Sequence, residues 1–203
     1  MGGLNPDAVR TSGRLGARVV WLPTFLSARD MERFGQPEKG ISVFEEEREL
    51  KKETIEVLEQ IKRYDLVLAT GHIDVDETNA VVDKARELGI ERIVITHAIT
   101  AHAGGQPTME EMKRWIGQGC TIEHVLYGLL PRARVISETD LADAIRELGP
   151  EHCIMSTDMG QIFNPPPAWG MRMFIASMLG NGITDDEVET MVKMNPAKVL
   201  GLA

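Results

Sequence analysis

Five short apolar runs recur along the 203-residue sequence, and they restrict the possible fold more than any other feature. The runs cover residues 17–22, 65–69, 92–96, 121–127 and 153–157. They are apolar without alternation, as strands buried on both faces are. Segments with helical spacing lie between them, and this alternation is typical of βα units around a parallel sheet. The sequence therefore predicts an α/β fold with five parallel strands in chain order.

The intervening segments carry their own helix boundaries. Three pairs have the spacing of a capping box, in which a hydroxyl residue precedes an acidic residue by three positions. The pairs are Thr108 with Glu111, Ser137 with Asp140, and Thr184 with Glu187. Each pair predicts the start of a helix.

Composition limits the classes of function. A formal net charge of −9 and a pI near 5.1 disfavour binding to nucleic acids or anionic membrane surfaces. The longest apolar stretches are far shorter than the roughly 20 residues that span a membrane, and the N-terminus has no signal-peptide pattern. Two cysteines without CxxC spacing, Cys120 and Cys153, suit a reduced compartment. We expect a cytoplasmic protein with a single domain over residues 1–203.

Two segments are longer than the βα rhythm requires, residues 24–50 and 164–169. Each follows the carboxyl end of a predicted strand. Ligands bind at that edge in βα sheets and barrels, so extra length there favours enclosure of a substrate.

A metal-ligand residue follows three of the predicted strands. His72 follows the second strand, His97 the third and Asp158 the fifth. If the parallel strands curve into a barrel, their carboxyl ends converge at one mouth. Two imidazoles and a carboxylate are suitable ligands there for Zn²⁺, Mn²⁺ or Fe²⁺. The sequence therefore predicts a site for a divalent metal, with zinc as the first choice.

The motifs around these residues resemble the second half of amidohydrolase-superfamily proteins. They are GHIDVDE, VITHA, STDMG and the closing MNPAKVLGL. The opening GGLNPDAVRTSGRLGARVVWLPT, with ATGHIDVDET and THAITAHAGGQPTMEEMKRWIGQG, is similar to an uncharacterised amidohydrolase-like family of unknown function. The resemblance extends over nearly the whole chain.

The resemblance implies a TIM-type barrel in which the visible strands are the fourth to the eighth. It implies that His72, His97 and Asp158 are metal ligands and that Asp158 is also the catalytic base. The implied activity is hydrolysis of a C–N or C–O bond in an amide, cyclic imide, lactone or ester, through a metal-activated water. The alternatives are an amidohydrolase-like decarboxylase or other lyase, and a non-catalytic partial barrel that needs a partner.

The sequence departs from the superfamily pattern in two places. The HxH pair that the superfamily carries on its first strand is absent from all 203 residues. A barrel also needs eight strands and about 250 residues, so we expect the first three βα units to be missing. The first visible strand, VVWLPT, lacks the lysine or glutamate that bridges two metals in binuclear members. One metal is therefore the simpler expectation, and activity of this chain alone is an open question.

Four further residues are candidates for contact with a small-molecule substrate. His124 neighbours Glu123 in a strand, and only one of the two can face the barrel interior; a core histidine is an equal alternative. His102 lies in a Gly-rich loop, where it either reaches over the mouth or lies in solvent. Trp169 and Arg172 follow the NPPP loop. The unpaired sheet edges of a partial barrel also predict association, either with a second copy or with a missing N-terminal half.

Overall fold

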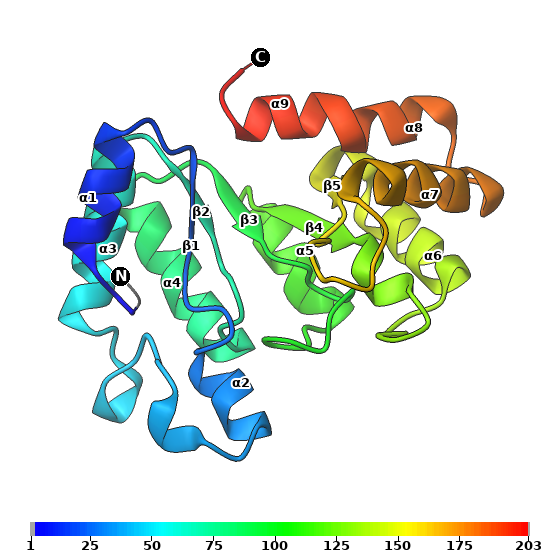
Figure 1. The fold of residues 1–203 in the computed structure, drawn as a ribbon. Helices are drawn as coiled ribbons and strands as arrows, with labels where there is room; N and C mark the ends of the chain where they lie inside the picture. The colour runs from blue at the N-terminus through cyan, green and yellow to red at the C-terminus, as the bar shows by residue number, and fades with distance from the viewer. Residues whose placement is uncertain (1–2, 203) are drawn as a thin grey trace. The chain divides into compact units, whose positions relative to one another are not determined.

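The computed structural model describes residues 3–202, and its centre is one sheet of five parallel strands (Figure 1). The strands follow one another in chain order, β1-β2-β3-β4-β5. Their bounds are Val19–Trp21 for β1, Val67–Ala69 for β2, Ile93–Ile95 for β3, Thr121–Val125 for β4 and Cys153–Ser156 for β5. The predicted five-stranded parallel sheet in chain order is confirmed, and it is compatible with part of a TIM-type barrel.

The chain forms two compact units. Of the described residues, the first unit contains 3–96, 103–106 and 118–120, and the second contains 97–102, 107–117 and 121–202. The expectation of a single domain therefore stays a prediction.

The first unit contains β1 to β3 and four α-helices. The helices are α1 (Pro6–Arg14), α2 (Ala28–Arg33), α3 (Lys52–Arg63) and α4 (Val75–Glu87). In β2 and β3 every residue is buried, and the apolar faces of α3 and α4 are buried as well. The register pairs Val19 with Val67 and Leu68 with Ile93. This core fixes the carboxyl end of β2, and that end determines where His72 lies.

The second unit contains β4, β5 and the remaining helices. They are α5 (Met109–Gly117), α6 (Glu138–Leu148), α7 (Pro167–Gly180), α8 (Asp185–Glu189) and α9 (Asn195–Val199), with a π-helical turn at Thr190–Met194 between the last two. The core includes Trp115, Ile122 and Phe174, each almost without exposed surface. Register pairs Glu123 with Ile154 and Val125 with Ser156.

Short 3₁₀ turns complete the connections. They lie at Pro37–Lys39, Glu46–Arg48, Leu126–Leu129 and Pro150–His152. Two of these turns and α2 fall within residues 24–50, so this long predicted loop is partly helical. Among residues 3–202 no helix is long and apolar enough to cross a membrane.

Candidate metal centre

His72 lies in a tightly bonded turn at the carboxyl end of β2. Two hydrogen bonds to threonine hydroxyls join the strand ends: Thr96 N donates to Thr70 Oγ1, and Gly71 N donates to Thr96 Oγ1, both at 3.0 Å. Gly71 has a φ of +63°, and a Cβ at this position would lie 2.4 Å from the carbonyl oxygen of Leu22. Only glycine fits here. The chain therefore turns sharply, and His72 follows at a fixed place.

The ring of His72 is buried and held by a carboxylate. Its Nδ1 lies 2.6 Å from Asp30 Oδ2, and Asp30 is itself 1% exposed. The ring of Phe25 approaches edge-on, with 5.6 Å between the centroids. A hydrogen-bonded carboxylate on one nitrogen is the usual support of a metal-binding histidine. The environment of His72 is therefore of the kind that supports a metal-binding histidine, and its ligand role stays a prediction.

His97 begins a turn that is bonded to β4 in the second unit. Its backbone N–H donates to Glu123 Oε2 at 3.1 Å, and Ala98 N donates to the Glu123 carbonyl oxygen. Thr100, which is fully buried, accepts from Val125 N at 2.9 Å. His97 has a φ of +33°, a conformation that a non-glycine residue adopts at a cost and keeps only when its surroundings enforce it.

Glu123 is the carboxylate at the centre of this second group. Its Oε1 accepts from Ser156 Oγ at 2.8 Å, while Oε2 accepts from His97. Burial raises the pKa of Glu123, the two hydrogen bonds oppose that rise, and the negative charge of Asp158 adds to it. The carboxyl group therefore keeps its proton to a higher pH than an exposed glutamate does.

Asp158 lies just beyond β5 and also has a positive φ, +50°. The carbonyl oxygen of the preceding Thr157 accepts from Tyr127 N, and that of Asp158 accepts from Gln161 Nε2 at 3.0 Å. Its side chain is exposed.

The predicted ligands are divided between the two units. His72 and Asp30 belong to the first unit, whereas His97, Glu123 and Asp158 belong to the second. Within residues 3–202 no three His, Cys, Asp or Glu side chains are gathered closely enough to hold a metal ion. The metal site therefore stays a prediction, although the donor set of two imidazoles and a carboxylate suits a divalent cation.

The four candidate substrate residues differ in exposure. His124 has no exposed surface, and neither of its ring nitrogens has a hydrogen-bond partner among the described residues. Burial alone lowers its pKa to about 4. This enclosure favours the alternative of a core histidine, and contact of His124 with a substrate stays a prediction. His102 is exposed in its loop.

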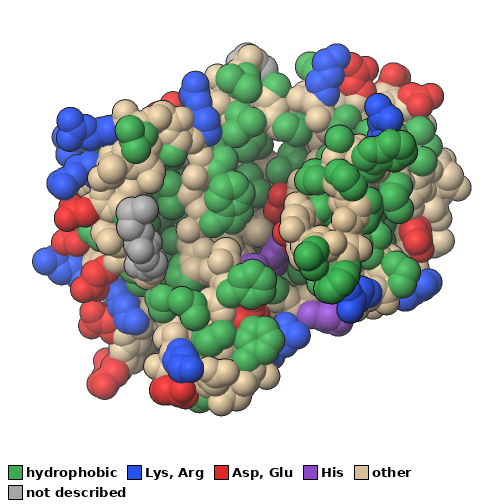
Figure 2. Space-filling view, in the orientation of Figure 1, with side chains coloured by type: hydrophobic (Ala, Val, Ile, Leu, Met, Phe, Trp, Pro, Cys, Tyr) green, Lys and Arg blue, Asp and Glu red, His purple; other side chains and the backbone are tan. Residues whose placement is uncertain are grey.

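Trp169 and Arg172 lie on the first turns of α7, where Figure 2 shows hydrophobic side chains gathered. Trp169 is 62% exposed, and the Arg172 guanidinium lies 5.6 Å from its ring centroid. Arg132 lies over the ring of Phe163 in the same unit, at 4.7 Å. Both arginine–aromatic pairs follow the carboxyl ends of β4 and β5, where a substrate would be expected.

Sequence reasoning missed Asp30 and left Glu123 unassigned. Asp30 lies 42 residues before His72, and no local pattern links the two. Glu123 did carry a signal, because a charged residue in an otherwise buried strand is unusual.

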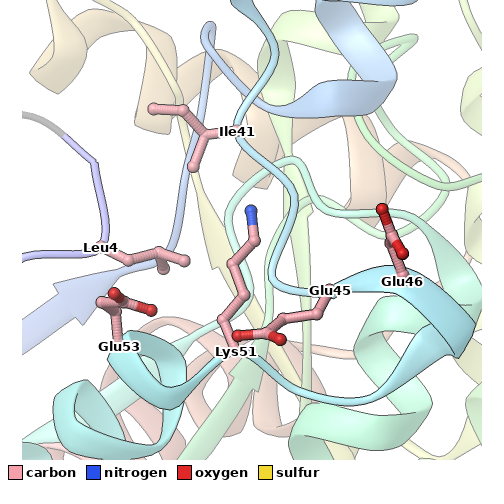
Figure 3. A pocket seen from close by; sticks show the side chains of 6 residues that line it. All are labelled: Leu4, Ile41, Glu45, Glu46, Lys51 and Glu53. Carbon is pink, nitrogen blue, oxygen red and sulfur yellow. The ribbon is translucent and has the colours of Figure 1, made fainter.

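A shallow pocket in the first unit contains none of the predicted residues. It has a volume of about 660 Å³ and is lined by Leu4, Ile41, Glu45, Glu46, Lys51 and Glu53. Figure 3 shows Lys51 among the three glutamates and the two apolar side chains. The Lys51 ammonium donates to the Ser42 carbonyl oxygen at 2.9 Å, so this side chain is engaged in holding the loop.

The fold is that of the amidohydrolases. A crystal structure of an amidohydrolase from Pseudomonas aeruginosa matches with a TM-score of 0.68 and 13% identity, over 96% of this chain and 67% of that protein. An organophosphorus hydrolase variant from Deinococcus radiodurans matches with a TM-score of 0.54 and 15% identity, over 75% of this chain and 53% of that protein. N-acetyl-D-glucosamine-6-phosphate deacetylase from Mycobacterium smegmatis matches with a TM-score of 0.52 and 16% identity, over 98% of this chain and 63% of that protein. The chain spans between about half and two thirds of the length of these three proteins.

The family is identified from the sequence. Residues 1–123 match the model of a family of unknown function, DUF6282, and the chain belongs to that family. The resemblance predicted from the motifs is therefore confirmed, both for the amidohydrolase fold and for the uncharacterised family. No curated protein sequence matches the chain.

Proposed function

We propose that the protein is a metal-dependent hydrolase that cleaves a C–N or C–O bond of a small-molecule amide, cyclic imide, lactone or ester. The observation that carries this proposal is the support given to both histidines. His72 is held through Nδ1 by the buried carboxylate of Asp30, and His97, in a left-handed conformation, is held through its backbone N–H by the carboxyl group of Glu123. Such support is expected of residues whose position matters to chemistry.

In this proposal His72, His97 and Asp158 hold one divalent cation, with zinc as the first choice. When bound, such a cation supplies Lewis-acid chemistry: it polarises a carbonyl group and makes water more acidic. Asp158 has the further role of general base, and its exposed carboxylate would take the proton from the attacking water.

Two arginine–aromatic pairs support a substrate site near the loops of the second unit. Arg172 and Arg132 each stack on an exposed aromatic ring, which leaves the guanidinium edges able to donate hydrogen bonds. We propose Trp169 and Arg172 as substrate contacts. His102, exposed in its own loop, is a further proposed contact.

The absence of HxH from the sequence leaves three of the superfamily's ligands. We propose that further βα units, or a second copy of the chain, complete the ligand set. The alternative is a non-catalytic partial barrel, because a chain can retain three ligands without activity.

The test is hydrolysis of a panel of lactones, cyclic imides, amides and esters by the full-length gene product loaded with Zn²⁺, Mn²⁺ or Fe²⁺. Asp158→Asn should lower kcat by a factor of about 10² to 10⁴ and also lower the metal content, because Asp158 is one of the proposed ligands, whereas Asp186→Asn, an exposed aspartate on α8, should change neither. Equal turnover by Asp158→Asn and the wild type would remove the general-base role.

A further inference from the structure

Asp30 joins three separate segments of the first unit. It lies on α2, and its Oδ2 contacts His72 Nδ1 at 2.6 Å while Oδ1 accepts from the backbone N–H of Gly104 at 3.2 Å. The guanidinium of Arg33 lies 3.8 Å from Oδ1. A carboxylate that is 1% exposed loses its hydration, and such hydrogen bonds must compensate for that loss. The buried position of Asp30 therefore depends on His72 and Gly104.

A carboxylate at Nδ1 determines which ring nitrogen of histidine carries the proton. A carboxylate only accepts hydrogen bonds when ionised, so Nδ1 must donate. In the neutral ring Nε2 is then left with its lone pair directed away from Asp30. A metal ligand needs that lone pair.

We propose that Asp30 is the positioning residue of His72: it fixes the Nδ1–H tautomer and the ring orientation, so that Nε2 is the nitrogen offered to a cation. The role of this arrangement in metal binding rests on the proposed function. The tautomer itself is a property of the first unit alone.

The loop that contains Gly104 packs against the backbone of His72. Gly104 has a φ of +70°, and a Cβ on it would lie 3.0 Å from His72 Cα, so this loop packs directly on the histidine backbone. Gly105 N donates to the Ile73 carbonyl oxygen at 3.1 Å. The ring of Phe25, with its centroid 5.6 Å from that of His72, adds a further contact to the imidazole.

Hydrogen bonds hold the chain both before and after helix α2, which carries Asp30. Ser27 caps α2 by accepting from Asp30 N at 3.1 Å. Farther along, Glu77 of α4 accepts from Ser42 Oγ at 2.5 Å and from Val43 N at 2.9 Å. Glu77 also closes the capping box of α4 with Asp74. The long segment after β1 therefore presents a fixed carboxylate to His72.

The first experiment determines the His72 tautomer in the metal-free 203-residue chain. Histidines labelled with ¹⁵N are observed by long-range ¹H–¹⁵N correlation at about pH 8, where an ordinary imidazole is neutral, and His72→Gln assigns the resonance. We expect Nδ1 protonated in the wild type and in Asp30→Asn, whose amide oxygen still accepts the bond. Asp30→Ala should shift the ring toward the Nε2–H form that imidazole prefers in water.

Asp76→Asn is the matched control, because Asp76 is an acidic residue of the same unit with a half-exposed side chain. It should leave the His72 resonances unchanged. An Nε2–H tautomer in the wild type would overturn the proposal, whether or not Asp30→Ala folds. An unchanged tautomer in a folded Asp30→Ala variant would also overturn it.

The second experiment measures Zn²⁺ affinity in the full-length gene product by competition with a chromogenic chelator. Asp30→Ala should weaken binding by a factor of about 10 to 100, with a smaller loss in Asp30→Asn and none in Asp76→Asn. If the tautomer changes as expected while affinity does not, Asp30 still positions His72, and it is the proposed ligand role of His72 that fails.

Discussion

Replacing His124 with leucine should change how stability depends on pH. His124 lies on β4 with no exposed surface, and its ring nitrogens lack hydrogen-bond partners among the described residues. Burial lowers its pKa from 6.5 to about 4. In the folded protein the ring is therefore neutral under conditions in which the unfolded chain binds a proton.

The sign and size of the effect follow from these two values. Between pH 6.5 and about pH 4 the unfolded state binds more protons, so the free energy of unfolding falls as the pH falls through this window. The loss from this one group amounts to about 2 kcal/mol on going from about pH 7 to about pH 5, and to about 3 kcal/mol at about pH 4. His124→Leu removes this contribution. At about pH 7 it should also stabilise the protein by about 1 to 3 kcal/mol, because it removes two unsatisfied nitrogens.

The assay is urea unfolding followed by circular dichroism at about pH 7 and about pH 5. The wild type should lose about 2 kcal/mol more than His124→Leu between these conditions. His152→Leu is the matched control, since the His152 side chain is 43% exposed, and it should keep the wild-type pH dependence. Equal losses in the wild type and in His124→Leu would refute the assignment of a neutral, buried ring.

Two further predictions concern packing in the described units. Gly128→Ala should destabilise the second unit by about 1 to 3 kcal/mol or more, because its Cβ would lie 1.9 Å from the Thr100 carbonyl oxygen; an unchanged melting temperature would contradict this. Burial raises the pKa of Cys120 to about 11 and that of Cys153 to about 12, so neither thiol should react with iodoacetamide at about pH 8 until urea unfolds the chain. Rapid labelling of the folded protein at either position would show that the thiol is accessible.

The strands and several helix starts could be predicted because their signals are local. All five strands lie inside the apolar runs that predicted them. Ser137 caps α6, and Thr184 forms a full capping box with Glu187 at α8. These features depend on residues within a few positions of one another, so spacing alone reveals them.

The supports of the site could not be predicted in the same way. The contact between Asp30 and His72 depends on the path of the segment after β1, which carries no regular period. Glu123 and His124 are neighbours on one strand, and alternation could not decide which of them is enclosed. The capping box of α4 could be predicted from the sequence, because Asp74 and Glu77 have the required spacing inside the motif GHIDVDE.

The central claim is that His72, His97 and Asp158 are ligands of one metal in a larger ligand set. It is tested most directly by the metal content of two purified proteins, the 203-residue chain and a version extended upstream to include a strand ending in HxH. We predict about one tightly bound Zn²⁺ per chain, with hydrolysis, in the extended protein, and weak or no binding in the 203-residue chain, because affinity comes from several ligands fixed together. His97→Gln should abolish stoichiometric binding in the extended protein. Stoichiometric tight metal and turnover in the 203-residue chain alone, or full binding by His97→Gln, would contradict the claim.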